Sequence, residues 1–245
     1  MHKVVSFYKD DLPAELIEAQ KKVFEYFNIE LQQVSFSGFY TELPHKGLID
    51  NDCHAHAIER YLINNNDWDS ITLFDVDCVP FESNCIERAL DIIKDRNTIY
   101  GNAQASNTGE HNLYTSPPFA APSFLSFTRN IWEDYKEYWY TNLKKEIGAF
   151  TFQWYPNPDG NMTEADVAEV FTRENEKRGR KIVMAYPSKD SPYDNSWTYK
   201  GGFGYPAFSY GNCNEFTSGT CHNFQIRIPD KQRYFIDYCN NILNK

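Results

Sequence analysis

Apolar residues in the first hundred positions follow two alternating spacings, one typical of strands and one typical of helices. Short apolar runs predict strands over residues 3–8, 31–36, 70–74 and 98–100. Between these runs, apolar residues recur every three or four positions and predict helices over residues 12–27, 52–63 and 82–94. This alternation predicts a parallel β-sheet covered by helices on both faces.

The second half of the chain has a less regular pattern. Strands are predicted over residues 123–127 and 181–186, and helices over 130–145, 163–178 and 229–243. Thr163 is in position to cap the second of these helices. Segments 148–161 and 190–205 are rich in Gly, Pro and aromatic residues, and we expect them to be loops. No linker separates the two halves, so we expect one α/β domain over residues 1–245.

Composition and charge exclude several classes of partner. The chain has 24 Lys and Arg residues against 34 Asp and Glu residues, a formal charge of −10. Binding of nucleic acid needs clustered positive charge, so we expect no nucleic-acid partner. No run of 18 apolar residues occurs, and we therefore expect no integral membrane segment. The segment from Met1 to Phe7 resembles a strand more than a signal peptide.

The six cysteines are widely spaced and form no CxxC pair. Without a secretory signal, we expect reduced thiols and a cytoplasmic location. A zinc site formed by Cys213, Cys221 and His222 is conceivable, but their spacing matches no familiar zinc-binding pattern.

Two aspartates, Asp75 and Asp77, directly follow the buried strand over residues 70–74. In parallel sheets, ligands bind beyond the carboxyl ends of the strands. Residues two apart in extended chain point to the same side, and two close carboxylates repel unless a cation compensates them. Hard oxygen ligands suit Mg²⁺ or Mn²⁺, which could link both carboxylates to a diphosphate. The alternative is an acidic turn without a ligand.

At this point the chain resembles the metal-dependent, nucleotide-sugar-using glycosyltransferases of the GT-A fold. The resemblance spans residues 1–230 and rests on three features. They are the strand that ends in Asp75-Val76-Asp77, the acidic segment 163–171 with Gly179 and a strand behind it, and the late His222. It implies an α/β, GT-A-like (nucleotide-diphospho-sugar transferase) domain with a mostly parallel central sheet flanked by helices. Residues 1–102 would bind the nucleotide and residues 103–245 the acceptor.

The resemblance also implies a metal ion, Mn²⁺ or Mg²⁺, held by Asp75, Asp77 and His222. Asp75 would in addition contact the sugar or the ribose, and the ion would neutralise the leaving diphosphate. His222 could equally be a loop histidine with a water or backbone partner.

A base is implied at Asp166 or Glu164, which would take the proton from an acceptor hydroxyl. Ala165 separates these two acids, whereas the family commonly has an adjacent pair, and Asp166 better fits the spacing to Gly179. The alternative is that both acids only stabilise the start of a helix, by roughly 0.3–1 kcal/mol.

For the nucleotide-sugar donor, a UDP- or GDP-sugar, the resemblance implies contacts at the end of the first strand, at the start of the second helix and at the acidic pair. These residues are Ser6, Phe7, Tyr8, Asp52, Asp75, Val76 and Asp77. The acceptor would be a glycan or another hydroxyl compound. Aromatic residues in the loops suit stacking on a sugar acceptor: Trp154, Tyr155, Trp197, Tyr199 and Phe203. His54 and His56 lie two apart on a predicted helix and share no face, so they are not expected to form a metal site together.

Three alternative functions remain open on the sequence alone. A phosphatase of the haloacid dehalogenase type would use Asp75 and Asp77, although its motif normally lies near the N-terminus. A sugar nucleotidyltransferase would need a glycine-rich basic loop, which is absent from residues 6–12. A non-catalytic glycan-binding protein of the same fold would keep the aromatic residues without the catalytic acids.

Overall fold

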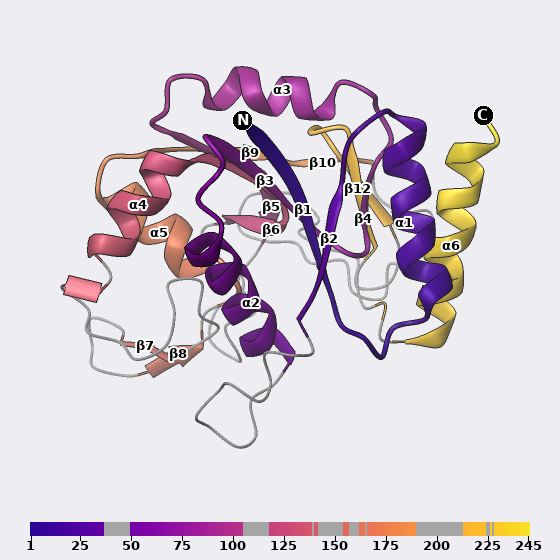
Figure 1. Ribbon diagram of the computed structural model, residues 1–245, viewed down its shortest axis with the longest axis horizontal. Coiled ribbons are helices and arrows are strands. Elements are labelled where there is room, and N and C mark those ends of the chain that lie inside the picture. Colours follow the sequence, from indigo (N-terminus) through magenta and orange to yellow (C-terminus); the bar gives the residue numbers. More distant parts are fainter. Residues whose placement is uncertain are drawn as a thin grey trace.

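The computed structural model describes most of the chain in an α/β arrangement (Figure 1). The described residues are 1–36, 50–104, 118–138, 140–141, 154–156, 162–164, 166–189, 213–223, 226 and 228–245. The side chains of residues 50–53, 154–156, 162–164, 189 and 213 are not among those described.

A six-stranded sheet forms the centre of the fold. Its order is β2 (Gln32–Ser35), β1 (His2–Tyr8), β3 (Ser70–Asp75), β6 (Phe119–Thr128), β5 (Thr98–Gln104) and β9 (Lys181–Ala185). β1 pairs in parallel with β2 and β3, and β5 pairs in parallel with β9. β6 is antiparallel to both β3 and β5, so it runs against the other strands. The expected mostly parallel sheet is therefore confirmed, with one reversed strand that the apolar pattern did not reveal.

Helices cover both faces of this sheet, as the sequence predicts. The helices α2 (Asp50–Asn64), α4 (Arg129–Tyr138) and α5 (Glu169–Lys177) pack in one apolar core with Phe127 and Leu125. The helices α1 (Ala14–Tyr26), α3 (Cys85–Ile93) and α6 (Pro229–Leu243) pack in a second core, around Phe74 and Phe124. α1 and α6 lie side by side (Figure 1).

A second, antiparallel sheet starts where β3 ends. Its order is β10 (Pro187–Lys189), β11 (Cys213–Phe216), β12 (Thr220–Asn223) and β4 (Cys78–Pro80). A separate pair is formed by β7 (Trp154–Pro156) and β8 (Met162–Glu164). All six of these strands have three or four residues and were not predicted, because segments so short show no alternation.

The helix predicted over residues 163–178 is wrong in its first part. Residues 162–164 form β8, and the helix α5 begins only at Glu169. Ala168, the residue before the helix, has a positive φ of 65°, which turns the chain there. Thr163 therefore caps no helix. The terminal helix, in contrast, has the predicted bounds, residues 229–243.

The expectation of reduced thiols holds for only some cysteines. Cys78, Cys85 and Cys239 are free and buried. Cys221 is disulfide-bonded, which the sequence reasoning did not anticipate. A disulfide sulfur is no thiolate ligand, so the conceivable zinc site that included Cys221 is not supported. None of the helices in the described part of the chain has the length and apolar character needed to cross a membrane.

The turn between β11 and β12 depends on a glycine. Gly219 has a φ of +81°, and its carbonyl accepts a hydrogen bond of 2.9 Å from the Phe81 backbone N–H. A Cβ atom at residue 219 would lie 2.8 Å from Glu82 Oε2 and 3.0 Å from Glu82 Cβ. Gly179 has a similar φ of +83°, but nothing lies within 4 Å of the corresponding Cβ position.

We expect both Gly219→Ala and Gly179→Ala to lower the free energy of unfolding, by about 1 kcal/mol for the left-handed backbone alone. Gly219→Ala should cost about 1 kcal/mol more, because the new methyl group overpacks against Glu82. Urea unfolding of the two variants measures the difference. Equal losses would show that Glu82 gives way and that the contact does not constrain the turn.

Candidate functional site

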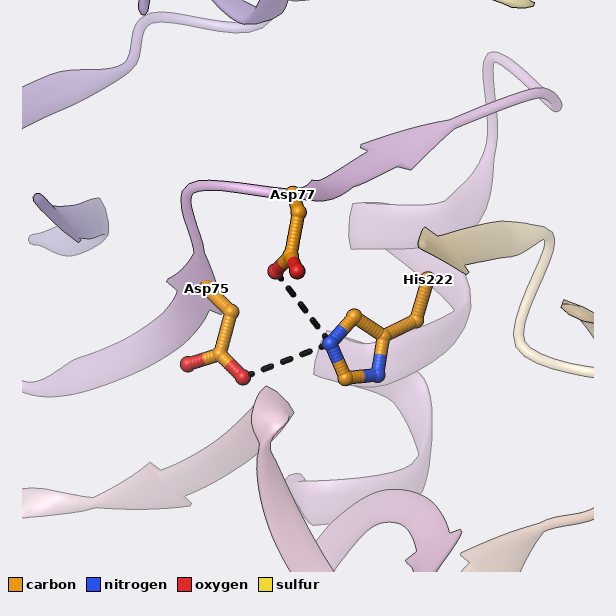
Figure 2. A group of neighbouring side chains, drawn as sticks. All are labelled: Asp75, Asp77 and His222. Carbon is orange, nitrogen blue, oxygen red and sulfur yellow. Dashed lines mark ion pairs between the residues drawn. The ribbon is translucent and has the colours of Figure 1, made fainter. Parts of the chain in front are cut away.

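The turn after β3 directs Asp75 and Asp77 to the same place. Asp75 is the last residue of β3, opposite Phe7 of β1, and β4 starts at Cys78. Val76, between the two aspartates, packs in the apolar core on the α1 side. The carboxylates of Asp75 and Asp77 point toward the same place, beside the ring of His222 (Figure 2). This is the arrangement that the DxD spacing predicts.

His222 reaches the same place from the far end of the chain. In the ladder between β12 and β4, His222 pairs with Cys78. The backbone N–H of Asn223 donates a hydrogen bond of 2.8 Å to the carbonyl oxygen of Asp77. As a result, Nε2 of His222 lies 3.2 Å from Oδ1 of Asp77 and 3.6 Å from Oδ2 of Asp75 (Figure 2).

The charges of this cluster are strongly coupled. Burial raises the pKa of Asp75 to about 7, His222 opposes that rise, and the charge of Asp77 adds to it. Burial also disfavours a charged His222, but the two aspartates outweigh burial and bring its pKa above the usual value. Both shifts mean that the cluster tends to hold protons, which a bound cation would displace.

The donor atoms fit a divalent metal ion. Two ligand atoms that each lie about 2.1 Å from one ion are separated by about 3.0–3.4 Å, close to the two separations seen here. One atom from each of Asp75, Asp77 and His222 can be chosen so that all three lie within 4.8 Å of one another. Oδ1 of Asp75 is buried and accepts no hydrogen bond from the described residues. Carboxylate oxygens with one imidazole suit Mn²⁺ and also admit Mg²⁺.

A second histidine, His54 of α2, lies on the other side of Asp75. Its Nε2 atom is 3.6 Å from Oδ1 of Asp75, and its ring stacks on Phe36 with centroids 5.6 Å apart. The sequence reasoning excluded a metal site shared by His54 and His56 and did not associate either with Asp75. The alternation of strands and helices could have suggested it, because a helix between two parallel strands begins at the carboxyl end of the sheet, where β3 also ends.

Asp166 lies just before α5 and is almost fully buried. Its Oδ2 accepts a hydrogen bond of 2.7 Å from Gln104 at the end of β5, and its Oδ1 accepts one of 2.9 Å from the Val167 N–H. Burial raises the pKa of Asp166 to about 7, the Val167 hydrogen bond opposes the rise, and the charges of Glu169 and Asp75 add to it. This coupling to Asp75 places Asp166 in the electrostatic surroundings of the Asp75–Asp77–His222 cluster. Sequence reasoning missed Gln104.

The other predicted contacts of the donor lie as follows. Ser6 and Phe7 are fully buried in β1, and Oγ of Ser6 makes no hydrogen bond within the described part of the chain. Phe7 packs on His54 and Tyr61, and Tyr8 is partly buried. Their contacts with a nucleotide stay predictions.

Several predicted site residues have side chains outside those that the structure describes. They are Glu164 in β8, Asp52 in α2, Trp154 and Tyr155, which lie in the strand β7 and not in a loop as predicted, and Trp197, Tyr199 and Phe203, which lie outside the described residues altogether. Their roles also stay predictions.

Comparison with known proteins identifies the fold. No protein-family profile matches the chain, and no curated protein matches its sequence. A solved structure of an active-site mutant of LgtC matches 100% of this chain and 95% of its own, at 10% identity and a TM-score of 0.50. At this identity the match shows the fold alone, which is the GT-A fold of glycosyltransferases, as the sequence predicts.

Two further structures are similar at lower scores. The galactosyltransferase LgtC in complex with donor and acceptor sugar analogs matches 100% of this chain and 95% of its own, at 9% identity and a TM-score of 0.49. The mannosyltransferase PcManGT from Pyrobaculum calidifontis, in complex with GDP-Man and Mn²⁺, matches 80% of this chain and 59% of its own, at 11% identity and a TM-score of 0.46.

The raised pKa of Asp166 predicts how stability depends on pH in metal-free protein. The carboxyl titrates near 7 in the folded state and near 3.9 when unfolded, so folded protein binds more protons between these values. The free energy of unfolding should therefore fall as pH rises from about 4 to about 7. Asp166→Asn cannot ionise, and we expect its free energy of unfolding to exceed that of the wild type at pH 8 by on the order of 4 kcal/mol, with no difference near pH 4.

Urea unfolding in the presence of a chelator at both pH values provides the measurement. Asp237→Asn, on an exposed part of α6, is the matched control and should show no such pH-dependent difference. A variant at Asp166 that gains nothing at pH 8 would contradict the predicted cost of ionising this buried acid.

Proposed function

We propose that this protein is a metal-dependent glycosyltransferase that moves a sugar from a nucleotide-diphosphate sugar to an acceptor hydroxyl. The observation that carries the proposal is the meeting of Asp75, Asp77 and His222 at the carboxyl end of β3. A likeness of fold does not by itself indicate an activity, since one fold serves many functions. Here the acidic cluster lies where open α/β sheets bind their ligands.

Asp75, Asp77 and His222 would hold Mn²⁺ or Mg²⁺ at this position. When bound, the ion acts as a Lewis acid that stabilises negative charge on the departing diphosphate. Asp77 and His222 are fixed by the backbone ladder between β4 and β12, so their donor atoms are already in place before a ligand arrives. Such preorganisation avoids the cost of moving dipoles and charges during the reaction.

Asp166 would be the base that accepts the proton of the acceptor hydroxyl. The acceptor oxygen forms a bond to the anomeric carbon, the bond from that carbon to the diphosphate oxygen breaks, and the hydroxyl proton passes to a carboxylate oxygen of Asp166. A pKa of about 7 suits this role, because a base works best when its pKa lies near the working pH. Glu164 remains the alternative base.

The proposal also covers the donor, the acceptor and the location of the protein. The donor is a UDP- or GDP-sugar contacted by Ser6, Phe7, Tyr8, Asp52 and the turn Asp75-Val76-Asp77. The acceptor is a glycan or another hydroxyl compound bound by residues 103–245, and the location is cytoplasmic.

We expect one nucleoside diphosphate to stabilise the protein only when Mn²⁺ is present. Ligand at 100 times its Kd adds about 2.7 kcal/mol to the free energy of unfolding. Thermal unfolding with UDP, GDP and CMP, each with and without Mn²⁺, measures this effect. Asp77→Ala should abolish the metal-dependent part, since it removes a ligand that the backbone holds in place.

A control variant and two further assays separate this function from the alternatives. Asp237→Ala is the control that should keep the full effect. Hydrolysis of a generic phosphomonoester, with a phosphate trapped on Asp75, would favour a phosphatase. Nucleotide binding without transfer to any acceptor would favour a glycan-binding protein.

Asp166→Asn should spare metal-dependent nucleotide binding and lower transfer by at least 100-fold, because the amide cannot accept the proton. Product formation from a panel of UDP- and GDP-sugars with glycan acceptors measures the rate. Transfer at the wild-type rate would show that Asp166 is not the base, and Glu164→Gln would then be the variant to measure.

A further inference from the structure

A buried glutamine, Gln20, is hydrogen-bonded to the backbone of the turn over residues 75–78. Gln20 is on the inner face of α1 and has no exposed surface. Its Nε2 donates a hydrogen bond of 2.8 Å to the carbonyl oxygen of Asp75 and one of 3.0 Å to the carbonyl oxygen of Cys78. One amide group thus joins the two ends of the turn that contains Val76 and Asp77.

A second glutamine fixes the orientation of the first. Nε2 of Gln33, in β2, donates hydrogen bonds of 3.0 Å to Oε1 of Gln20 and of 2.9 Å to the carbonyl oxygen of Ile17. Every N–H of both amides is therefore used. With the Gln20 amide rotated by 180°, its oxygen would face two carbonyl oxygens, so only the observed orientation is satisfied.

The three hydrogen bonds of the Gln20 amide restrict which residue can occupy this position. Two carbonyl acceptors and one amide donor require a neutral side chain with two N–H groups and one oxygen, which only Gln and Asn provide. A buried polar group is costly without its partners, so an ordinary core position of α1 would favour an apolar residue. Leu16, Ala19 and Val23 occupy the neighbouring core positions of the same helix.

We propose that Gln20 is a positioning residue for the metal centre, held in place by Gln33. Its two hydrogen bonds fix the backbone on both sides of Asp77, while the Asn223 N–H holds the carbonyl oxygen of Asp77 itself. Gln20 thus holds the carbonyl groups of Asp75 and Cys78, and Asn223 holds that of Asp77. With the turn fixed in this way, the carboxylates of Asp75 and Asp77 stay within reach of His222. Gln20 does not touch the metal ion or the substrate.

This inference rests on the proposed function, and Mn²⁺ affinity tests it without any need for turnover. Gln20→Met keeps the length of the side chain and removes both donors. We expect the Kd for Mn²⁺, measured by the loss of the free-ion electron paramagnetic resonance signal, to rise at least tenfold, because loss of outer-shell partners typically weakens metal sites about 10–100-fold. A rise of less than threefold in folded protein overturns the inference, and any larger rise supports it.

Ser126→Ala is the matched control. Ser126 is also fully buried in the central sheet, where its hydroxyl lies 2.8 Å from that of Thr72. Its loss should lower stability and leave the Kd for Mn²⁺ unchanged, whereas an equal rise in both variants would mean that general loosening explains the effect and would overturn the inference.

If Gln20→Met does not fold, Gln33→Met decides the matter. It removes only the donor that orients Gln20, so a rise of the Kd above twofold supports the inference and a smaller change overturns it. The proposed function and the inference about Gln20 can be overturned separately. Wild-type protein without Mn²⁺ binding overturns the proposed function and the inference with it, whereas wild-type binding that Gln20→Met retains overturns the inference alone.

Discussion

The repulsion between two carboxylates that share a small, largely buried volume is the constraint on which the rest of this structure depends. Asp75 and Asp77 are brought together by the turn that follows β3, and burial makes the charge of Asp75 costly. In the described part of the chain, two imidazole rings lie beside these carboxylates, that of His222 and, at Asp75, that of His54. A compact divalent cation is the natural remaining partner, which is why the electrostatics and the donor geometry lead to the same proposal.

The elements around this turn come from distant parts of the chain and act on it in different ways. β12 contributes both the imidazole of His222 and a backbone contact from Asn223. α1 contributes no charge, but Gln20 holds the turn through its carbonyl groups. The end of β5 contributes Gln104, which orients Asp166 near the same centre. The fold thereby gathers a buried carboxyl group and the Asp75–Asp77–His222 cluster, which are the groups that the proposed sugar transfer would use.

The apolar pattern predicted the longer elements well, because each long helix or strand repeats its period several times. The acidic pair could be recognised from the sequence because it directly follows β3, a buried strand that its apolar run predicts. The start of α5 was misjudged because Ala168 has a left-handed backbone that propensities do not show. His222 was found by resemblance alone, since a four-residue strand gives no periodic signal. Gln20 offered one signal, a polar residue at a core position between Ala19 and Val23, and its meaning depends on a contact with residues more than fifty positions away.

The origin of His222 in β12 has a consequence for the order in which the centre is assembled during synthesis. The ribosome delivers Asp75 and Asp77 long before β12 has emerged, and chains generally begin to fold from the N-terminal side. A nascent chain that already contains β3 has the acidic pair without its imidazole and without the backbone contact from Asn223. The proposed cation site is therefore complete only after β12 has been synthesised and has paired with β4.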